Sequence, residues 1–355
     1  MKILNIYTGG TISSAFNTDG VISVKENQTS KIIDLYRDFA RNSDFDDSSD
    51  IEFCELSPYT ILSENLSSSY LLKLIECLKE PLKDSSLDGI IIAHGTDTLQ
   101  YTASILSYIF CNARIPIVLV SADFVMDDPR SNAIINFTSA VNFIRDCHAK
   151  NIINFENIKL SGGVFVSYCN VSGYPTIHLG SRLSNPVLLS ADLDSVLESE
   201  LCIYTGHKFK LNPNCSLKNM EPLPLDIENI RLCETSDSVL RLRPYPGFSY
   251  DLISDTYLDR VKVVLHETFH AGTCAISPDF IAFTQKCKAR NIPIYISGLN
   301  KHEKVYETSA RYQELSVEVL EPSSTIGAYC KLWLALSNDL DIREVMRTCY
   351  SSDWV

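Results

Sequence analysis

Residues 7–13 (YTGGTIS) and 94–98 (HGTDT) are the two stretches that decide how this sequence folds. Each follows a short apolar run, KILNIY at 2–7 and IIIA at 90–93, that predicts a buried strand. In an open α/β sheet, the loops at the carboxyl ends of the strands surround the ligand-binding crevice. We therefore expect both turns at one edge of a sheet, facing the same ligand.

The segments between and beyond these turns alternate between helix and strand. Apolar residues recur at helical spacing over 69–80, and the stretches 99–110 and 133–144 also predict helices. Continuous apolar runs at 115–120 and 164–168 predict further strands. Buried strands that alternate with helices are typical of a parallel sheet covered on both faces.

The rest of the chain predicts a second domain. Residues 205–227, rich in Pro, Asn and Lys, are expected to be a linker. Beyond them, SVLRLRPYPG, RVKVVLHET, IPIYISG and a helical pattern at 329–336 form another α/β series. We expect two α/β domains: a larger N-terminal catalytic domain with a mainly parallel sheet over 1–204, and a smaller C-terminal domain over 228–355.

The composition excludes several classes of partner. The 355-residue chain is 45% hydrophobic and 21% charged, as in an ordinary soluble protein. Its net charge of −13 disfavours binding to nucleic acid, whose phosphates carry the same sign. No apolar run approaches the roughly 18–20 residues that span a bilayer, so no membrane partner is expected.

The cysteines and the N-terminus favour a cytoplasmic protein. None of the 12 cysteines forms a C-x-x-C pair, which indicates reduced structural thiols and no metal site. The first apolar run ends in a glycine turn and lacks the small-residue cleavage site of a secretory signal, so no export signal is expected.

The two turns contain groups suited to acyl transfer. Gly9 and Gly10 let the backbone turn sharply and approach a ligand closely. Thr11 presents a hydroxyl beside backbone N–H groups, and Thr96 with Asp97 adds a hydroxyl and a carboxylate. A threonine hydroxyl is a weak nucleophile that needs a neighbouring base. One such turn alone more often caps a helix, but two turns after suitable strands favour a catalytic site.

With TGGTI at 8–12 and HGTDT at 94–98, the sequence resembles the bacterial-type L-asparaginase/glutaminase family. LSENL at 62–66 resembles the family's loop for the substrate carboxylate. DPRSNAIINF at 128–137 is similar to the helix start after the family's third strand. The resemblance covers most of the first domain and is weaker in the second, where RPYPG at 243–247 carries it.

The resemblance implies an amidohydrolase that needs neither a metal nor another cofactor. Thr11 would be the nucleophile, and Thr96 with Asp97 would form the second catalytic group. The implied reaction hydrolyses a small side-chain carboxamide, with asparagine as the expected substrate, through an acyl-threonine ester and releases ammonia. Because family sites are completed across a subunit interface, a homodimer or homotetramer is expected.

The resemblance also assigns the groups that bind the substrate. Ser63 and Glu64 would contact its α-carboxylate and α-amino ends, and Asp97 would also hold the amino group. The carbonyl of Ala122 would receive the leaving nitrogen. Gly10 belongs to the turn whose backbone N–H groups would stabilise the oxyanion.

Two family features are missing from this sequence. The mobile lid after the first motif usually contains a Tyr, where this chain has Val21. The family's triad Lys has no counterpart, because no Lys occurs between Lys159 and Lys208 and only His178 and Arg182 are basic at the expected place. Three possibilities stay open: one of these two residues substitutes for the Lys, a different relay operates, or activity is weak or lost. A solvated loop position is the plainer interpretation of His178.

Two other patterns carry less weight. His266, Glu267 and His270 match H-E-x-x-H, but the motif follows a predicted strand, whereas zinc proteases need it on a helix. The acidic residues of 44–50 lack the glycine and glutamate of a calcium loop, and a surface turn is expected there. Besides an asparaginase, the sequence is compatible with an amidase for a peptide or specialised-metabolite amide and with a catalytically impaired binding protein.

Overall fold

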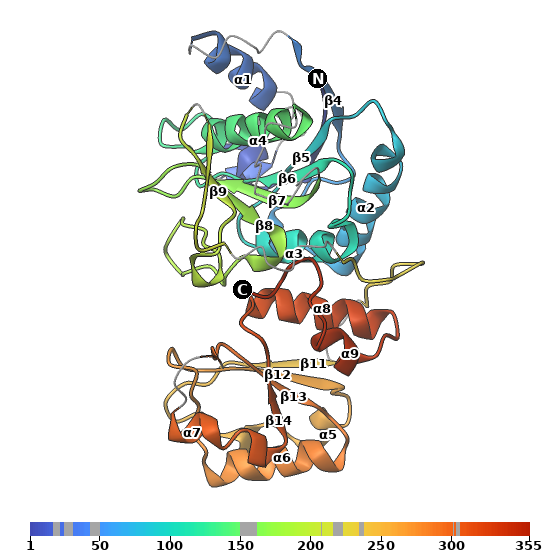
Figure 1. Ribbon diagram of the computed structural model, residues 1–355, viewed down its shortest axis with the longest axis vertical. Helices are drawn as coiled ribbons and strands as arrows, with labels where there is room; N and C mark the ends of the chain where they lie inside the picture. Colours follow the sequence, from blue (N-terminus) through green and yellow to red (C-terminus); the bar gives the residue numbers. More distant parts are fainter. Residues whose placement is uncertain are drawn as a thin grey trace. The chain divides into compact units, whose positions relative to one another are not determined.

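The computed structural model describes residues 1–16, 22–24, 31–42, 50–149, 162–206, 208–215, 223–233, 238–300, 302 and 306–355. These residues form two compact α/β units, which confirms the predicted fold class (Figure 1). The first unit comprises Met1–Glu228 and Tyr350–Ser352, and the second comprises Asn229–Cys349 and Asp353–Val355. Among the described residues, no helix combines the length and apolar character that a membrane crossing requires.

The first unit contains an eight-stranded sheet in the order β10-β9-β8-β7-β6-β5-β1-β4. Its strands are β1 Lys2–Tyr7, β4 Glu52–Leu56, β5 Gly89–Ala93, β6 Pro116–Val120, β7 Gly163–Tyr168, β8 Thr176–Leu179, β9 Cys202–Tyr204 and β10 Phe209–Leu211. Strands β4, β1, β5, β6 and β7 pair in parallel, and β8, β9 and β10 add antiparallel pairs at one edge. The short strand β10 lies within 205–227, the segment expected to be a linker. A separate hairpin joins β2 Ser14–Phe16 to β3 Ile22–Val24.

Helices cover both faces of this sheet, as its continuous apolar strands predict. They are α1 Lys31–Asn42, α2 Ser68–Lys79, α3 Leu99–Phe110 and α4 Ala133–His148. Figure 1 shows α1 and α4 on one side of the sheet and α2 and α3 on the other. On the α4 side, Val118, Val120 and Phe165 pack with Phe137 and Ile144 of the helix. Burial on both faces explains why β5 and β6 consist almost entirely of aliphatic residues.

The register of the parallel strands brings four strand ends to one edge. Tyr7 pairs with Ala93, Ala93 with Val120, and Val120 with Ser167. The turns after β1, β5, β6 and β7 therefore leave the sheet side by side. This carboxyl edge is where ligands bind in open α/β sheets.

The second unit has a four-stranded parallel sheet in the order β11-β12-β13-β14. Its strands are β11 Val239–Leu242, β12 Val263–Glu267, β13 Ile294–Ser297 and β14 Val317–Val319. Its helices are α5 Asp255–Leu258, α6 Pro278–Ala289, α7 Glu307–Ala310, α8 Thr325–Ser337 and α9 Ile342–Met346. The sequence pattern predicted the first three strands and α8, and it missed β14 and the remaining helices.

Candidate active site

The turns after β1 and β5 touch each other through two glycines. A Cβ atom added to Gly10 would lie 2.2 Å from the Cα of Gly95, so no side chain fits between them. Gly9 and Gly10 also have φ angles of 107° and 77°, a region that favours glycine. Thr11 and Thr96 each follow one of the touching glycines. The backbones of the two predicted catalytic turns therefore meet at one place.

The backbone on both sides of Thr11 is held by hydrogen bonds. Gly10 N donates to Ile61 O at 2.9 Å, which joins the first turn to the loop that contains Ser63. After Thr11, the Ser14 hydroxyl donates to Gly10 O at 2.8 Å. Thr11 itself begins a 3₁₀ turn, Thr11–Ser13, and is half-buried. Its backbone is thus fixed while its side chain remains accessible.

His94 braces the second turn from inside the protein. Its Nδ1 lies 2.8 Å from Gly95 O, and its Nε2 lies 2.9 Å from the hydroxyl of Thr102 on α3. Because a carbonyl only accepts, Nδ1 carries the proton and Nε2 accepts from Thr102. Burial lowers the pKa of His94 to about 4, so the imidazole is neutral at pH 7. The sequence pattern did not predict this role, although the position of His94 directly after a buried strand could have indicated it.

The loop of Ser63 lies against the second turn. The Ser63 hydroxyl is 3.4 Å from the Oδ2 atom of Asp97, and the Thr98 hydroxyl donates to Ser63 O at 2.9 Å. A Cβ atom on Gly95 would lie 2.4 Å from Ser63 Oγ, so the contact is tight. Ser63 is buried, whereas Glu64 and Asp97 are exposed to solvent. Three chain segments thus bring the predicted binding carboxylates to the edge that also carries the threonine turns.

Two asparagines tie the ends of β6 and β7 together beside Ala122. Asn136, on α4, donates its Nδ2 to Ser121 O at 2.9 Å and accepts from Cys169 N at 2.7 Å. Asn132 donates to Cys169 O at 2.9 Å. Ala122 is wholly buried between these clamps. The sequence pattern did not predict the role of Asn136, because a polar residue within a predicted helix does not reveal which strand ends it bridges.

The structure corrects one interpretation of His178. It lies on β8 opposite Val166 and is wholly buried, so the solvated-loop interpretation is wrong. The antiparallel return of the chain after β7 is the physical reason for this burial. Its Nδ1 lies 2.9 Å from the Ser195 hydroxyl, and burial lowers its pKa to about 4. In the described part of the chain, its Nε2 has no hydrogen-bond partner, so no bond links it to Thr96.

Arg182 is buried and makes hydrogen bonds inside the first unit. It lies in a 3₁₀ turn directly after β8 and is almost completely buried. Its Nε donates to Ser352 O at 2.7 Å, and its Nη1 lies 3.8 Å from the Sγ atom of Cys215. Val21 and residues 44–49, which carried the lid and acidic-loop interpretations, lie outside the described residues.

The H-E-x-x-H motif begins on strand β12, not on a helix. His266 is buried there, with its Nε2 2.6 Å from the Tyr250 hydroxyl. Glu267 pairs with Arg241 at 2.7 Å. Zinc ligation needs the two histidines of the motif on one face of a helix, whereas His266 lies on a strand with its ring nitrogens beside the Tyr250 hydroxyl and Glu267 O. Within the described ranges, no three His, Cys, Asp or Glu residues are grouped to hold a metal ion.

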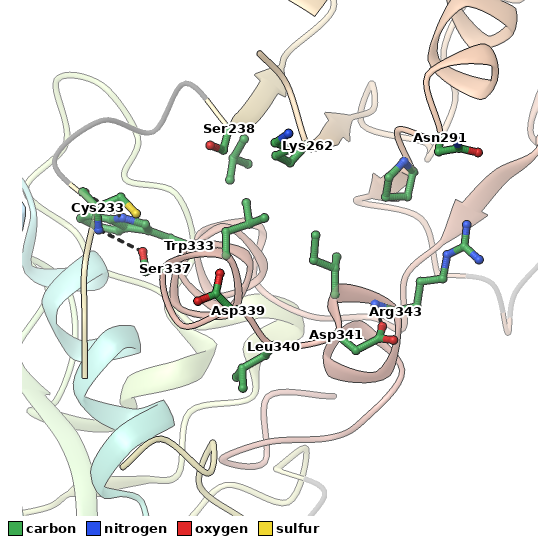
Figure 2. Close-up of a pocket in the computed structure, with 14 residues that line it drawn as sticks. Cys233, Ser238, Lys262, Asn291, Trp333, Ser337, Asp339, Leu340, Asp341 and Arg343 are labelled. Carbon is green, nitrogen blue, oxygen red and sulfur yellow. Dashed lines mark hydrogen bonds between the residues drawn. The ribbon is translucent and has the colours of Figure 1, made fainter. Parts of the chain in front are cut away.

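The second unit contains a pocket of about 600 Å³ (Figure 2). It lies beside residues that precede the strands, including Ser238, Lys262 and Pro293, and beside Trp333 of α8. The Trp333 indole donates to Cys233 O at 3.3 Å, which fixes the ring at the pocket wall. None of the predicted catalytic or binding residues lines this pocket.

Comparison with known proteins connects this site to a family. The family model described as Asparaginase, N-terminal, matches residues 2–170. A glutamyl-tRNA(Gln) amidotransferase subunit from Methanosphaera stadtmanae is 29% identical over 82% of this chain and 64% of its own length. The protein of the same name from Sulfurisphaera tokodaii is 28% identical over 82% of this chain and 63% of its own. The chain thus spans less than two thirds of the length of these curated relatives.

Two solved structures share the fold over the whole chain. The thermostable L-asparaginase from Thermococcus kodakarensis aligns with a TM-score of 0.74 and 22% identity, covering 100% of this chain and 99% of its own. L-asparaginase I from Vibrio cholerae aligns with a TM-score of 0.75 and 21% identity over the same shares. At these identities, the structural likeness concerns the fold.

Proposed function

We propose that this chain, whose residues 2–170 match the N-terminal model of the asparaginase family, is an amidohydrolase that cleaves a small side-chain carboxamide. The contact between Gly10 and Gly95 is the observation that carries the proposal. It supports a single site in which two threonine hydroxyls and the carboxylate of Asp97 serve one substrate. We also propose that the protein acts in the cytoplasm as a homodimer or homotetramer.

In the proposed reaction, Thr11 Oγ attacks the carbonyl carbon of the carboxamide. The hydroxyl proton passes to a basic relay that includes Thr96 and Asp97. The carbon–nitrogen bond then breaks, and the nitrogen leaves as ammonia after it gains a proton. Water attacks the acyl-threonine ester, which releases the acid and restores the Thr11 hydroxyl. Backbone N–H groups of the two glycine turns stabilise the oxyanion in both steps.

The binding groups fit a substrate with an amino acid head. Glu64 and Asp97 are exposed carboxylates that attract an ammonium group. Ser63 offers a hydroxyl to the α-carboxylate. The carbonyl of Ala122, held in place by the clamp of Asn136 on Ser121, would accept a hydrogen bond from the leaving nitrogen. We therefore propose asparagine as the first substrate to test.

Glutamine is the second candidate substrate. The curated relatives are named as subunits of a glutamyl-tRNA(Gln) amidotransferase, which favours glutamine as the amide donor and a partner chain as the recipient of the ammonia. The missing triad Lys favours two further candidates: an amidase for a different amide, and a binding protein with impaired catalysis. Because a neutral His178 supplies no positive charge at pH 7, it does not reproduce the electrostatic effect of a Lys.

An ammonia-release assay on asparagine, glutamine and peptide amides tests the proposal. Thr11→Ala and Thr96→Ala should each lower kcat on the preferred amide by on the order of 10³-fold or more, because each removes a reacting group. Thr205→Ala is the matched control, since that hydroxyl only donates to Lys208 O in a turn. Full activity of Thr11→Ala would remove the nucleophile assignment. Aspartate binding without turnover of any amide would favour the binding protein.

A further inference from the structure

The pocket of the second unit lies at the edge of the sheet where the strands begin. Ser238, Lys262 and Pro293 directly precede β11, β12 and β13, and residues of α8 and α9 also line the pocket. Ligand pockets usually enclose about 300–1,000 Å³ and combine apolar walls with a few polar groups. This pocket, of about 600 Å³, fits that description. We propose that it binds a small molecule in which a flat aromatic ring is joined to an anionic group.

Trp333 supplies an aromatic surface at one end of the pocket. It lies on α8 and is only half-buried. Its indole N–H donates to Cys233 O at 3.3 Å, and the ring of Tyr329 packs beside it with 6.1 Å between the two ring centroids. These contacts hold the indole ring in place. A flat ring of a ligand can therefore stack on it without a large loss of side-chain freedom on binding.

Two cations in the pocket have no acidic partner. Lys262 and Arg343 both line it and are exposed to solvent. Among the residues that the structure describes, neither side chain forms a salt bridge or a hydrogen bond. In Figure 2, Trp333 and Arg343 lie at opposite ends of the pocket, and Lys262 lies between them. A ligand stacked on the indole can therefore extend its anionic group toward the two cations.

The two acidic residues that line the pocket already have partners. Asp339 Oδ2 pairs with Arg231 Nη2 at 2.7 Å. Asp341 Oδ1 accepts hydrogen bonds from the backbone N–H groups of Arg343 and Glu344 at the start of α9. The negative charge of these acids is thus partly compensated, whereas the charge of the two cations is not. In a chain whose net charge is −13, this pocket therefore favours an anionic ligand over an ammonium or guanidinium ligand.

Nucleoside monophosphates and aromatic carboxylates both carry this chemistry, and two probes distinguish them. Isothermal titration calorimetry with adenosine monophosphate and with indole-3-acetate should give a Kd of about 1 mM or lower for at least one of the two. The probe that binds shows whether the anionic group is a phosphate or a carboxylate. Adenosine, which has a ring without the charge, and inorganic phosphate and acetate, which have a charge without the ring, should each bind at least about tenfold more weakly.

Substitutions test the two recognising groups separately. The double variant Lys262→Gln/Arg343→Gln should raise the Kd at least about tenfold, because it removes both cations. Trp333→Leu should raise the Kd by a similar factor, because it removes the stacking surface. Lys288→Gln is the matched control, since Lys288 is exposed on α6 and does not line the pocket. Circular dichroism should show that the charge variants are folded, because the substituted side chains are exposed.

Cys233 provides a second readout, located in the pocket itself. It lines the pocket, and it is the one exposed cysteine among the 12. A saturating concentration of the bound probe should slow its alkylation by iodoacetamide at least about threefold, because alkylation needs access to the thiolate.

Four results would each overturn the proposal: no binding of either probe, equal affinity for adenosine or for the free anion, an unchanged Kd in the folded double variant, or unprotected Cys233. Because no predicted catalytic residue lines the pocket, these results do not depend on the proposed amidohydrolase function.

Discussion

The backbones of Gly10 and Gly95 lie so close that neither position has room for a methyl group. The two residues are distant in sequence and follow strands β1 and β5, which pair in parallel. Their contact is the point at which the two threonine turns become one site. The two glycines are needed for different reasons. Gly10 has a positive φ angle, which favours glycine, whereas the φ angle of Gly95 is outside the left-handed range, so Gly95 is required only by the lack of space.

Gly95→Ala should disable the site through crowding alone. Its Cβ atom would lie 2.4 Å from Ser63 Oγ and 3.1 Å from Gly10 Cα, so one of the turns must shift. We expect a loss of about 1–3 kcal/mol in the free energy of unfolding. A fall of at least tenfold in kcat/KM should accompany it. Gly173→Ala, with nothing within 4 Å of the added atom, should leave both unchanged.

The stability of the protein should rise with pH between about 4 and 6.5. His94, His178 and His266 are buried and neutral, and burial lowers the pKa of each to about 4. The unfolded chain, with a pKa near 6.5, binds protons first as the pH falls, so acid favours unfolding. Each of these histidines should make the free energy of unfolding on the order of 2 kcal/mol smaller at pH 5 than at pH 7.

Urea unfolding at pH 5 and pH 7 measures this effect, with His178→Gln as the test variant. Because glutamine does not titrate, the free energy of unfolding of the first unit should differ less between pH 5 and pH 7 in this variant. His302→Gln is the control, because His302 is exposed on the surface beside Glu321. An unchanged pH dependence in His178→Gln would contradict the assignment of a neutral, buried imidazole.

Asn136→Ala should lower turnover more than its effect on folding explains. The substitution removes the bonds to the buried Ser121 O and the partly buried Cys169 N. We expect a destabilisation of about 1–3 kcal/mol and a kcat at least tenfold lower, with a smaller change in KM. Asn142 lies on the same helix as Asn136 and donates to the Tyr204 hydroxyl of β9, so Asn142→Ala should destabilise the protein without the change in kcat.

Lys331→Met should destabilise the second unit strongly. Lys331 Nζ lies 2.8 Å from Asp353 Oδ2 and donates to Thr348 O at 2.6 Å, and both charged side chains are buried. Removing Lys331 takes away the cation that faces the buried Asp353 carboxylate, which costs about 3–5 kcal/mol. The double substitution Lys331→Met/Asp353→Leu should recover much of that loss. Urea unfolding of the three proteins measures the coupling, and additive effects of the two substitutions would contradict it.

The fold was most predictable where strands are buried on both faces. Helix α3 begins and ends at the predicted residues, and β5 and β6 match their apolar runs within one residue. The antiparallel strands β8, β9 and β10 were missed because they are only three or four residues long. A strand as short as TIHL has too few residues for its alternation to be distinguished from a loop.

In the candidate site, too, some features were predictable from the sequence and others were not. Glycines and threonines after predicted strands located the two turns, because parallel strands end at a common edge. The braces around them depend on tertiary contacts that no local pattern encodes. Thr102 is eight residues from His94, and Asn136 bonds Ser121 and Cys169, which directly follow β6 and β7 and are 15 and 33 residues from it in sequence. The roles of Thr11, Thr96, Asp97 and Ala122 stay predictions for the ammonia-release assay.

The last residues of the chain complete the first unit from the opposite end of the sequence. Ser181 and Arg182 donate to the carbonyls of Ser351 and Ser352 at 2.8 and 2.7 Å, and Ser351 N donates back to Leu223 O. In a fragment that ends at Glu228, the buried guanidinium of Arg182 would lose one of its hydrogen-bond acceptors. Residues 1–228 should therefore fail as a self-sufficient module, and adding residues 350–352 to that fragment should restore its fold.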